Sequence, residues 1–113
     1  MSDWTRVEND TGPPIKDTLE TDGSADDLTG ATVAFTLWDP SDGTVKIDEN
    51  TSNVTFTTDG SDGKVEYEFA ADDLDTVGVY AVEWEVTFAD GTVVTYRREN
   101  GDPKELRVRS EGA

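Results

Sequence analysis

Adjacent carboxylates are the residues here whose types and spacing could do chemistry. They occur as three pairs, Asp26-Asp27, Asp48-Glu49 and Asp72-Asp73. Two carboxylates can share the acid and base roles of glycoside hydrolysis when an apolar pocket raises the pKa of one. Each pair falls in a predicted turn or at a strand end, and nothing beside it predicts such a pocket. Because 26 acidic residues make adjacent pairs common, we interpret the pairs as solvated surface.

Other kinds of catalytic and metal site are equally hard to build from this composition. The sequence has no histidine and no cysteine, which removes the commonest general base, the commonest zinc ligand and any thiolate. The acidic loops at 39–43 and 59–63 lack the alternating acids of a calcium-binding loop. We therefore predict a protein that is not an enzyme, with no catalytic residue, no metal site and no cofactor.

The net charge of −17 limits the partners that the chain can bind. Nucleic acid is excluded, because phosphate contacts require a basic face. A membrane span is not expected, because no apolar run approaches the roughly 20 residues that it needs. The first residues show neither the basic nor the apolar region of a signal peptide. Scarce lysine and abundant acid favour adaptation to high salt, with an acidic mesophilic protein as the alternative.

Disorder is the competing interpretation of this composition. Leu, Ile, Val and Phe total 23 of 113 residues, close to the roughly 20% below which a highly charged chain does not fold. The acidity is also uneven, since residues 1–91 carry 22 acids and 4 bases whereas residues 92–113 carry 4 acids and 5 bases. The basic end is either a cationic strand between acidic ones or a docking strip.

Period-two alternation of apolar and polar residues favours a folded chain over a disordered one. It recurs over 33–38, 54–56, 65–69, 80–88 and 106–109, and each segment would have one buried and one solvated face. Glycine- and aspartate-rich turns separate the segments. The pattern predicts an all-β fold, an immunoglobulin-like antiparallel β-sandwich of about seven or eight strands. We place this domain at 13–109, with a loosely held N-terminal arm at 1–12 and a C-terminal tail at 110–113.

The turn at 89–91 allows the strand register to be predicted. A two-residue loop would set Trp84 opposite Arg97 on the buried face. A three-residue loop with Gly91 in the left-handed region instead sets Trp84 opposite Tyr96 and Glu83 opposite Arg97. We predict the three-residue loop, because register follows the buried pattern.

Tyr80 follows a polar loop at the start of the longest predicted strand. It could form a tyrosine corner, in which the hydroxyl bonds back to the upstream backbone, or it could simply be buried. The pattern leaves both interpretations open.

Six side chains are candidates for an interface with another protein. They are two tryptophans outside the predicted core and four arginines near the C-terminal end: Trp4, Trp38, Arg97, Arg98, Arg107 and Arg109. Exposed aromatic and arginine side chains are common interface anchors. The alternatives are that the tryptophans pack against neighbouring loops and that the arginines neutralise acids across the sheet, such as Glu83 and Glu85.

An ordered set of short motifs carries a family resemblance. They are Pro-Pro-Ile at 13–15, Asp-Thr-Leu at 17–19, Asp-Gly at 22–23, Asp-Leu-Thr-Gly-Ala-Thr-Val at 27–33, Gly-Lys-Val-Glu-Tyr at 63–67, Gly-Val-Tyr at 78–80, Glu-Trp-Glu-Val-Thr-Phe at 83–88 and Asp-Gly-Thr at 90–92. Over residues 10–109 the chain resembles the immunoglobulin-like N-terminal domain of tailed-phage upper baseplate proteins. It departs from that family at 96–103, where the family often has Phe-Pro and a short polar loop.

The resemblance implies a structural or adaptor component of a tailed virus particle, in its tail, neck or baseplate. Its partners would be other virion proteins and further copies of itself in a symmetric ring, and it would be assembled in the cytoplasm of a salt-adapted host. The alternative is an immunoglobulin-like module that binds carbohydrate or a host surface, suggested by Trp4 and Trp38.

The charge also predicts that folding depends on salt. Because repulsion among excess carboxylates is screened by salt, the melting temperature should rise markedly between low and molar potassium chloride. Circular dichroism during heating measures this. A melting temperature that does not change with salt would contradict the interpretation of the acidity.

Overall fold

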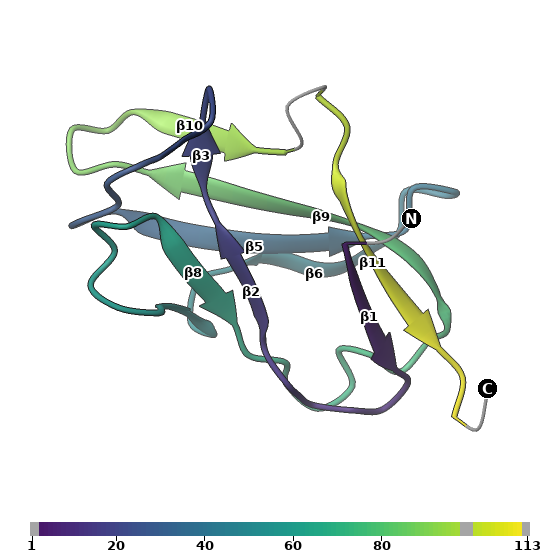
Figure 1. Ribbon diagram of the computed structural model, residues 1–113. Helices are drawn as coiled ribbons and strands as arrows, with labels where there is room; N and C mark the ends of the chain where they lie inside the picture. The colour runs from purple at the N-terminus through teal and green to yellow at the C-terminus, as the bar shows by residue number, and fades with distance from the viewer. Residues whose placement is uncertain (1–2, 98–100, 112–113) are drawn as a thin grey trace.

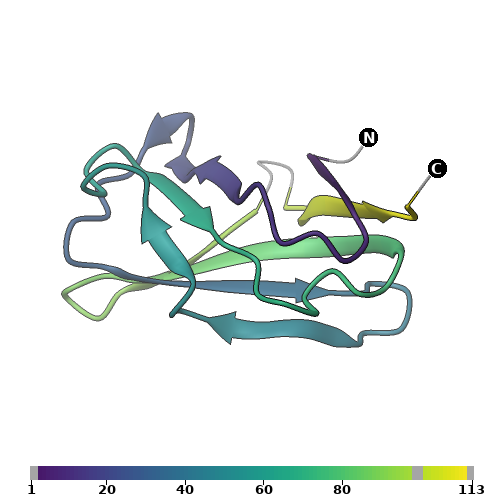
Figure 2. The same ribbon diagram turned by 90° about the horizontal axis from the view of Figure 1, so that it is seen from below.

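The computed structural model describes residues 3–97 and 101–111. These residues form an all-β sandwich in which a larger and a smaller sheet face each other, as Figures 1 and 2 show. They form no helix, and so no helix that could span a membrane. The fold class predicted from the sequence is therefore confirmed.

The larger sheet runs in the order β1-β11-β9-β5-β6, with β10 also paired to β9. Its strands are β1 (Trp4–Val7), β5 (Thr32–Trp38), β6 (Val45–Asn50), β9 (Gly78–Thr87), β10 (Val93–Tyr96) and β11 (Lys104–Arg109). All pairs are antiparallel except β1 with β11, which is parallel.

The smaller sheet has the order β2-β8-β7, and a separate hairpin lies beside it. The sheet consists of β2 (Ile15–Thr18), β7 (Val54–Phe56) and β8 (Lys64–Tyr67), and the hairpin of β3 (Glu20–Thr21) and β4 (Ser24–Ala25).

The described residues contain eleven strands, more than the seven or eight expected. Strands β10 and β11 pair with the same side of β9, β10 as far as Trp84 and β11 from Val82, so the pairing on this side of β9 is interrupted at Glu83. This interruption coincides with the segment that departs from the resembled family. The two-residue strands β3 and β4 are too short for alternation to reveal.

The core between the sheets is aromatic. Phe35, Tyr67 and Trp84 are fully buried. The Phe35 ring stacks on Tyr67 with centroids 4.2 Å apart and meets Trp84 edge-on at 4.9 Å. Each such pair adds about 0.5–1.5 kcal/mol to the stabilisation from area burial. These contacts join β5 and β9 of the larger sheet to β8 of the smaller one.

A single carboxylate ties the two layers together at one side of this core. The indole Nε1 of Trp84 donates to Asp17 Oδ2 at 3.0 Å, and the Lys104 ammonium donates to both carboxylate oxygens at 2.6 and 2.8 Å. The Asp17 side chain is only 12% exposed. The network therefore joins β2 to β9 and β11 and leaves the buried indole N–H satisfied.

The hairpin joining β9 to β10 has the predicted register. Tyr96 pairs with Trp84 and Val94 with Val86, and Gly91 has a φ of 90°. Arg97 Nη2 lies 2.6 Å from Glu83 Oε2. The buried pattern and the turn chemistry were sufficient to select this pairing.

A tyrosine corner precedes β9. The Tyr80 hydroxyl donates to the carbonyl oxygen of Thr76 at 2.7 Å. This contact decides between the two interpretations that the sequence left open.

The expectation that residues 1–12 are loosely held is wrong for Trp4–Val7. These residues form β1 in register with β11, and the Arg6 guanidinium donates to the carbonyls of Pro13 and Pro14 at 3.0 Å. Because a charged arginine occupies an inward position of β1, the sequence of this strand lacks the apolar alternation by which strands are recognised.

Two further tyrosines donate to carboxylates of the aspartate pairs. The Tyr67 hydroxyl lies 2.8 Å from Asp73 Oδ2, and the Tyr96 hydroxyl lies 2.6 Å from Asp26 Oδ2. Burial, followed by the adjacent carboxylate, raises the pKa of both phenols well above the usual value. These aspartates therefore act as acceptors that hold loops onto the sandwich.

Removing the Asp17 carboxylate, which joins the two layers, should destabilise the fold. In Asp17→Ala the Trp84 indole and the Lys104 ammonium lose their acceptor, so the free energy of unfolding should fall by roughly 2–3 kcal/mol. Urea unfolding in molar salt measures it. Asp10→Ala removes the same charge from an exposed site and should change little. Equal losses in the two variants would contradict the role of Asp17.

The tyrosine–carboxylate bonds predict a loss of stability at alkaline pH. A folded-state pKa raised above the unfolded value of about 10 stabilises the fold below that pH, and this contribution is lost as pH rises through the folded pKa. Urea unfolding across a pH series should therefore show falling stability above about pH 10. The fall should be shallower in a Tyr67→Phe, Tyr96→Phe variant. An identical slope in both proteins would argue against this origin.

Candidate functional site

The face of the larger sheet that points away from the smaller sheet, here called the outer face, is unusual for its apolar side chains. In the described chain the exposed large hydrophobic residues are Val7, Val45, Val77, Val79 and Val93, which are 37–55% exposed. Four of them occupy outward positions of β1, β6, β9 and β10, and Val77 lies immediately before β9. In the described chain, four of the five exposed large apolar side chains therefore share the outer face.

Strand register explains why these valines point outward. In β9 the buried residues Tyr80, Val82, Trp84 and Val86 alternate with Val79, Glu83 and Glu85. Val79 pairs with Arg107 of β11, and Arg109 pairs with Val7 of β1. Because paired residues share a face, the valines and arginines of three strands lie together at one end of the outer face.

The arginines of this face differ in their partners. Arg97 is bound to Glu83, and its guanidinium lies 5.9 Å from the centroid of the half-buried Trp38 ring. For Arg107 and Arg109 no hydrogen bond or ion pair is found within residues 3–97 and 101–111. Among the residues that the structure describes, these are two exposed cations without partners in a chain of net charge −17.

Acidic side chains occupy the other end of the outer face. Burial and the nearby carboxylates of Glu49 and Glu83 raise the pKa of Glu85. The backbone N–H of Glu49 donates to the outward hydroxyl of Thr36 at 3.2 Å, which places Glu49 beside β5. Like charges held close together are unfavourable in the free protein and favour a cationic neighbour.

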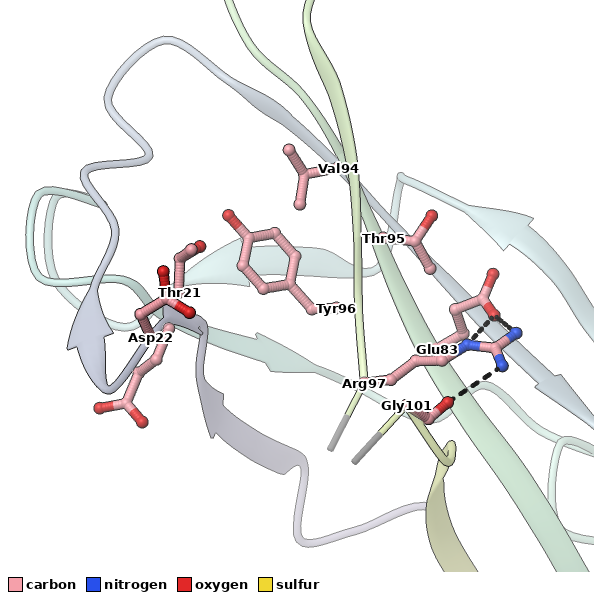
Figure 3. A pocket seen from close by; sticks show the side chains of 9 residues that line it. Thr21, Asp22, Glu83, Val94, Thr95, Tyr96, Arg97 and Gly101 are labelled. Atoms are coloured by element: carbon pink, nitrogen blue, oxygen red, sulfur yellow. Dashed lines mark hydrogen bonds and ion pairs between the residues drawn. The ribbon is translucent and has the colours of Figure 1, made fainter. Parts of the chain in front are cut away.

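An open depression of about 900 Å³ lies at the edge of this region, between β10 and the β3–β4 hairpin. Figure 3 shows Tyr96, Thr21 and Asp22 on one side and the Arg97–Glu83 pair on the other. The Thr21 and Tyr96 hydroxyls both donate to Asp26, each at 2.6 Å. Of the polar side chains that line the depression, Thr21 and Tyr96 are thus hydrogen-bonded to Asp26, and Arg97 is paired with Glu83.

The structure separates the six predicted interface residues. Trp38, Arg97, Arg107 and Arg109 all lie on the outer face, with Arg97 near the Trp38 ring and the other two arginines at the end that carries Val7 and Val79. Arg98 lies outside the described residues. Trp4 instead packs against the core, and its Nε1 donates to the Lys16 carbonyl at 3.3 Å. The alternative that tryptophans pack against neighbouring segments therefore holds for Trp4. The alternative that arginines neutralise acids across the sheet holds for Arg97, which pairs with Glu83.

Sequence reasoning missed the valines and Glu49. For Val79 and Val93 a signal existed, since both stand at polar positions of an alternating strand. For Val7 and Val45 there was none, because β1 had not been recognised and β6 contains register shifts against β5.

The described residues contain no group of three or more acidic side chains able to hold a metal ion. Two of the paired carboxylates, Asp26 and Asp73, are engaged in structural hydrogen bonds. Asp73 accepts from Tyr67 and from the Ala70 N–H, and Asp26 accepts from Tyr96 and Thr21.

Comparison with protein-family models found no match, and comparison with curated protein sequences found none either. Among solved structures, the chain is similar to CopC from Methylosinus trichosporium OB3b, with a TM-score of 0.54 and 13% sequence identity. The match covers 100% of this chain and 89% of that one. At this identity the similarity supports the β-sandwich fold alone.

Proposed function

We propose that this protein is a structural adaptor of a tailed virus particle and acts through protein–protein contacts of its outer face. The order of motifs at 13–92, which resembles the immunoglobulin-like domain of upper baseplate proteins, supports the virion role. Its partners are then other virion proteins and further copies arranged in a symmetric ring. Its location is the virion, assembled in the cytoplasm of a salt-adapted host.

The observation that carries a contact function is the composition of the outer face. It gathers exposed valines from four strands and two arginines without partners in the described chain, on a domain that is otherwise densely acidic. Arginine and apolar side chains are enriched in protein interfaces, whereas Asp and Glu are depleted. Nucleic acid is a poor partner for a chain of net charge −17.

A non-catalytic role agrees with the state of the polar groups. Without histidine or cysteine, acid–base or nucleophilic chemistry would depend on carboxylates, lysines or hydroxyls. Asp26 and Asp73, one from each of two pairs, accept hydrogen bonds from tyrosine hydroxyls, and Asp73 also accepts one from a backbone N–H. We accordingly propose that the protein is not an enzyme and needs no cofactor.

The alternative of a carbohydrate- or host-surface-binding module has less support. A sugar ring stacks on an open aromatic face, and the Arg97 guanidinium already lies over the Trp38 ring. The ring of Trp4 packs on the core, with the Lys104 ammonium 6.0 Å from its centroid.

Mass spectrometry of purified virions tests the proposed role. Particles washed in molar salt should contain the chain in a constant ratio to the other structural proteins. In a virus that carries Arg107→Ala and Arg109→Ala, incorporation should fall, because the exposed cations of the outer face are lost. Lys16→Ala with Lys64→Ala removes the same charge from the smaller sheet and should leave incorporation unchanged. Complete particles that lack the wild-type chain would refute the proposal.

A further inference from the structure

The two ends of the outer face carry opposite charges. Arg107 and Arg109 lie at the end that contains Val7 and Val79, and Glu49 and Glu85 lie toward the other end. Between them are Trp38 and Ala81, which face each other in the register of β5 and β9. Ala81 is only 2% exposed and the Arg97 guanidinium lies near the Trp38 ring, so the match depends on the charged ends. A surface with a cationic end and an acidic end can match a reversed copy of itself.

We propose that a second copy of this chain covers the outer face, with the two copies related by a two-fold axis that runs across the strands. In such an arrangement each contact occurs twice, because residue i meets residue j and j meets i. The inference identifies a partner for the contact surface on which the proposed function rests.

The spacing along β9 fits this arrangement. Val79 and Glu85 are outward residues of one strand, equidistant from Val82. An axis at the level of Val82 therefore brings the Val79 level of one copy over the Glu85 level of the other. Arg107 is the β11 neighbour of Val79, so its long side chain would approach Glu85 of the second copy across one interstrand spacing of about 4.8 Å.

The pairing would give the charged side chains partners of opposite charge and would cover exposed apolar side chains. Glu85 gains a cation where it now has the carboxylates of Glu49 and Glu83. Arg107 gains an acceptor that it lacks within the described residues. The exposed valines are removed from water, which supplies the non-directional part of the stabilisation.

The outer surface of the smaller sheet does not offer the same match. Its outward positions carry polar and charged side chains such as Lys16, Lys64 and Glu66, which are paired across β2 and β8. None of the exposed large hydrophobic residues of the described chain lies on it. In Figure 2 the larger and smaller sheets form opposite sides of the sandwich, so contacts on one leave the other free.

Charge exchange tests the self-complementary match. One variant, Arg107→Glu with Arg109→Glu, makes the outer face acidic at both ends, and the other, Glu49→Arg with Glu85→Arg, makes it basic at both ends. Sedimentation velocity in molar potassium chloride, which screens the net repulsion between copies, should show the wild type as a dimer. Each variant alone should dissociate, with affinity weakened on the order of tenfold or more. An equimolar mixture of the two should form dimers again.

Lys16→Glu with Lys64→Glu is the matched control, because it makes the same charge change on the smaller sheet and should remain dimeric. Circular dichroism verifies that each variant is folded, and Arg107→Ala with Arg109→Ala replaces the first variant if it is not. A wild type that stays monomeric, or a mixture that does not associate, would overturn the proposal. Pairing without incorporation into virions would refute only the proposed function, and incorporation without pairing would refute only this inference.

Discussion

The carboxylate of Asp17 is the group on which the arrangement of the two layers depends. It accepts the indole N–H of Trp84, the largest fully buried side chain, and the ammonium of Lys104. A polar N–H buried in an aromatic core requires an acceptor, and a largely enclosed carboxylate requires a counter-charge. The Asp17 carboxylate of β2 thus provides the hydrogen-bond acceptor for Trp84 of β9, and Lys104 of β11 provides its counter-charge. With Lys104 directed inward, alternation along β11 directs Arg107 and Arg109 outward. The interior network is thus linked to the outward direction of these two arginines.

The acidity of the chain and the character of its outer face have different physical origins. Several carboxylates lie in turns and accept hydrogen bonds from nearby backbone N–H groups, as Asp59 does from Ser61 and Asp90 from Thr92. Those carboxylates shape loops and keep the surface hydrated. The outer face has instead valine and arginine at positions where a solvated sheet would carry more acid. That contrast, more than any cavity, distinguishes one side of the sandwich as a contact surface, and it is the reason for proposing an adaptor.

Apolar alternation and turn chemistry were sufficient to predict strand pairing where two clearly alternating strands are joined by one short turn. The register of β9 and β10 followed from apolar alternation together with Gly91, and Arg97 therefore met Glu83 as expected. Prediction failed where strands were short or carried polar groups inward. In β1 the inward Arg6 hides the alternation, and in β6 the register shifts against β5 turn Val45 to the side of Trp38. Parallel pairing of β1 with β11 joins residues about one hundred positions apart, which no local pattern encodes.

From the sequence alone, periodicity determined the all-β class and the register of the longest hairpin, and composition removed histidine and cysteine chemistry. The tertiary structure decided which side chains meet. It turned Trp4 into the core, placed Arg97 over Trp38, and collected valines from β1, β6, β9 and β10 on one face. The physical reason is that alternation specifies which side of its own strand a residue occupies, whereas strand order specifies its neighbours. Here the order β1-β11-β9-β5-β6 joins segments from opposite ends of the chain.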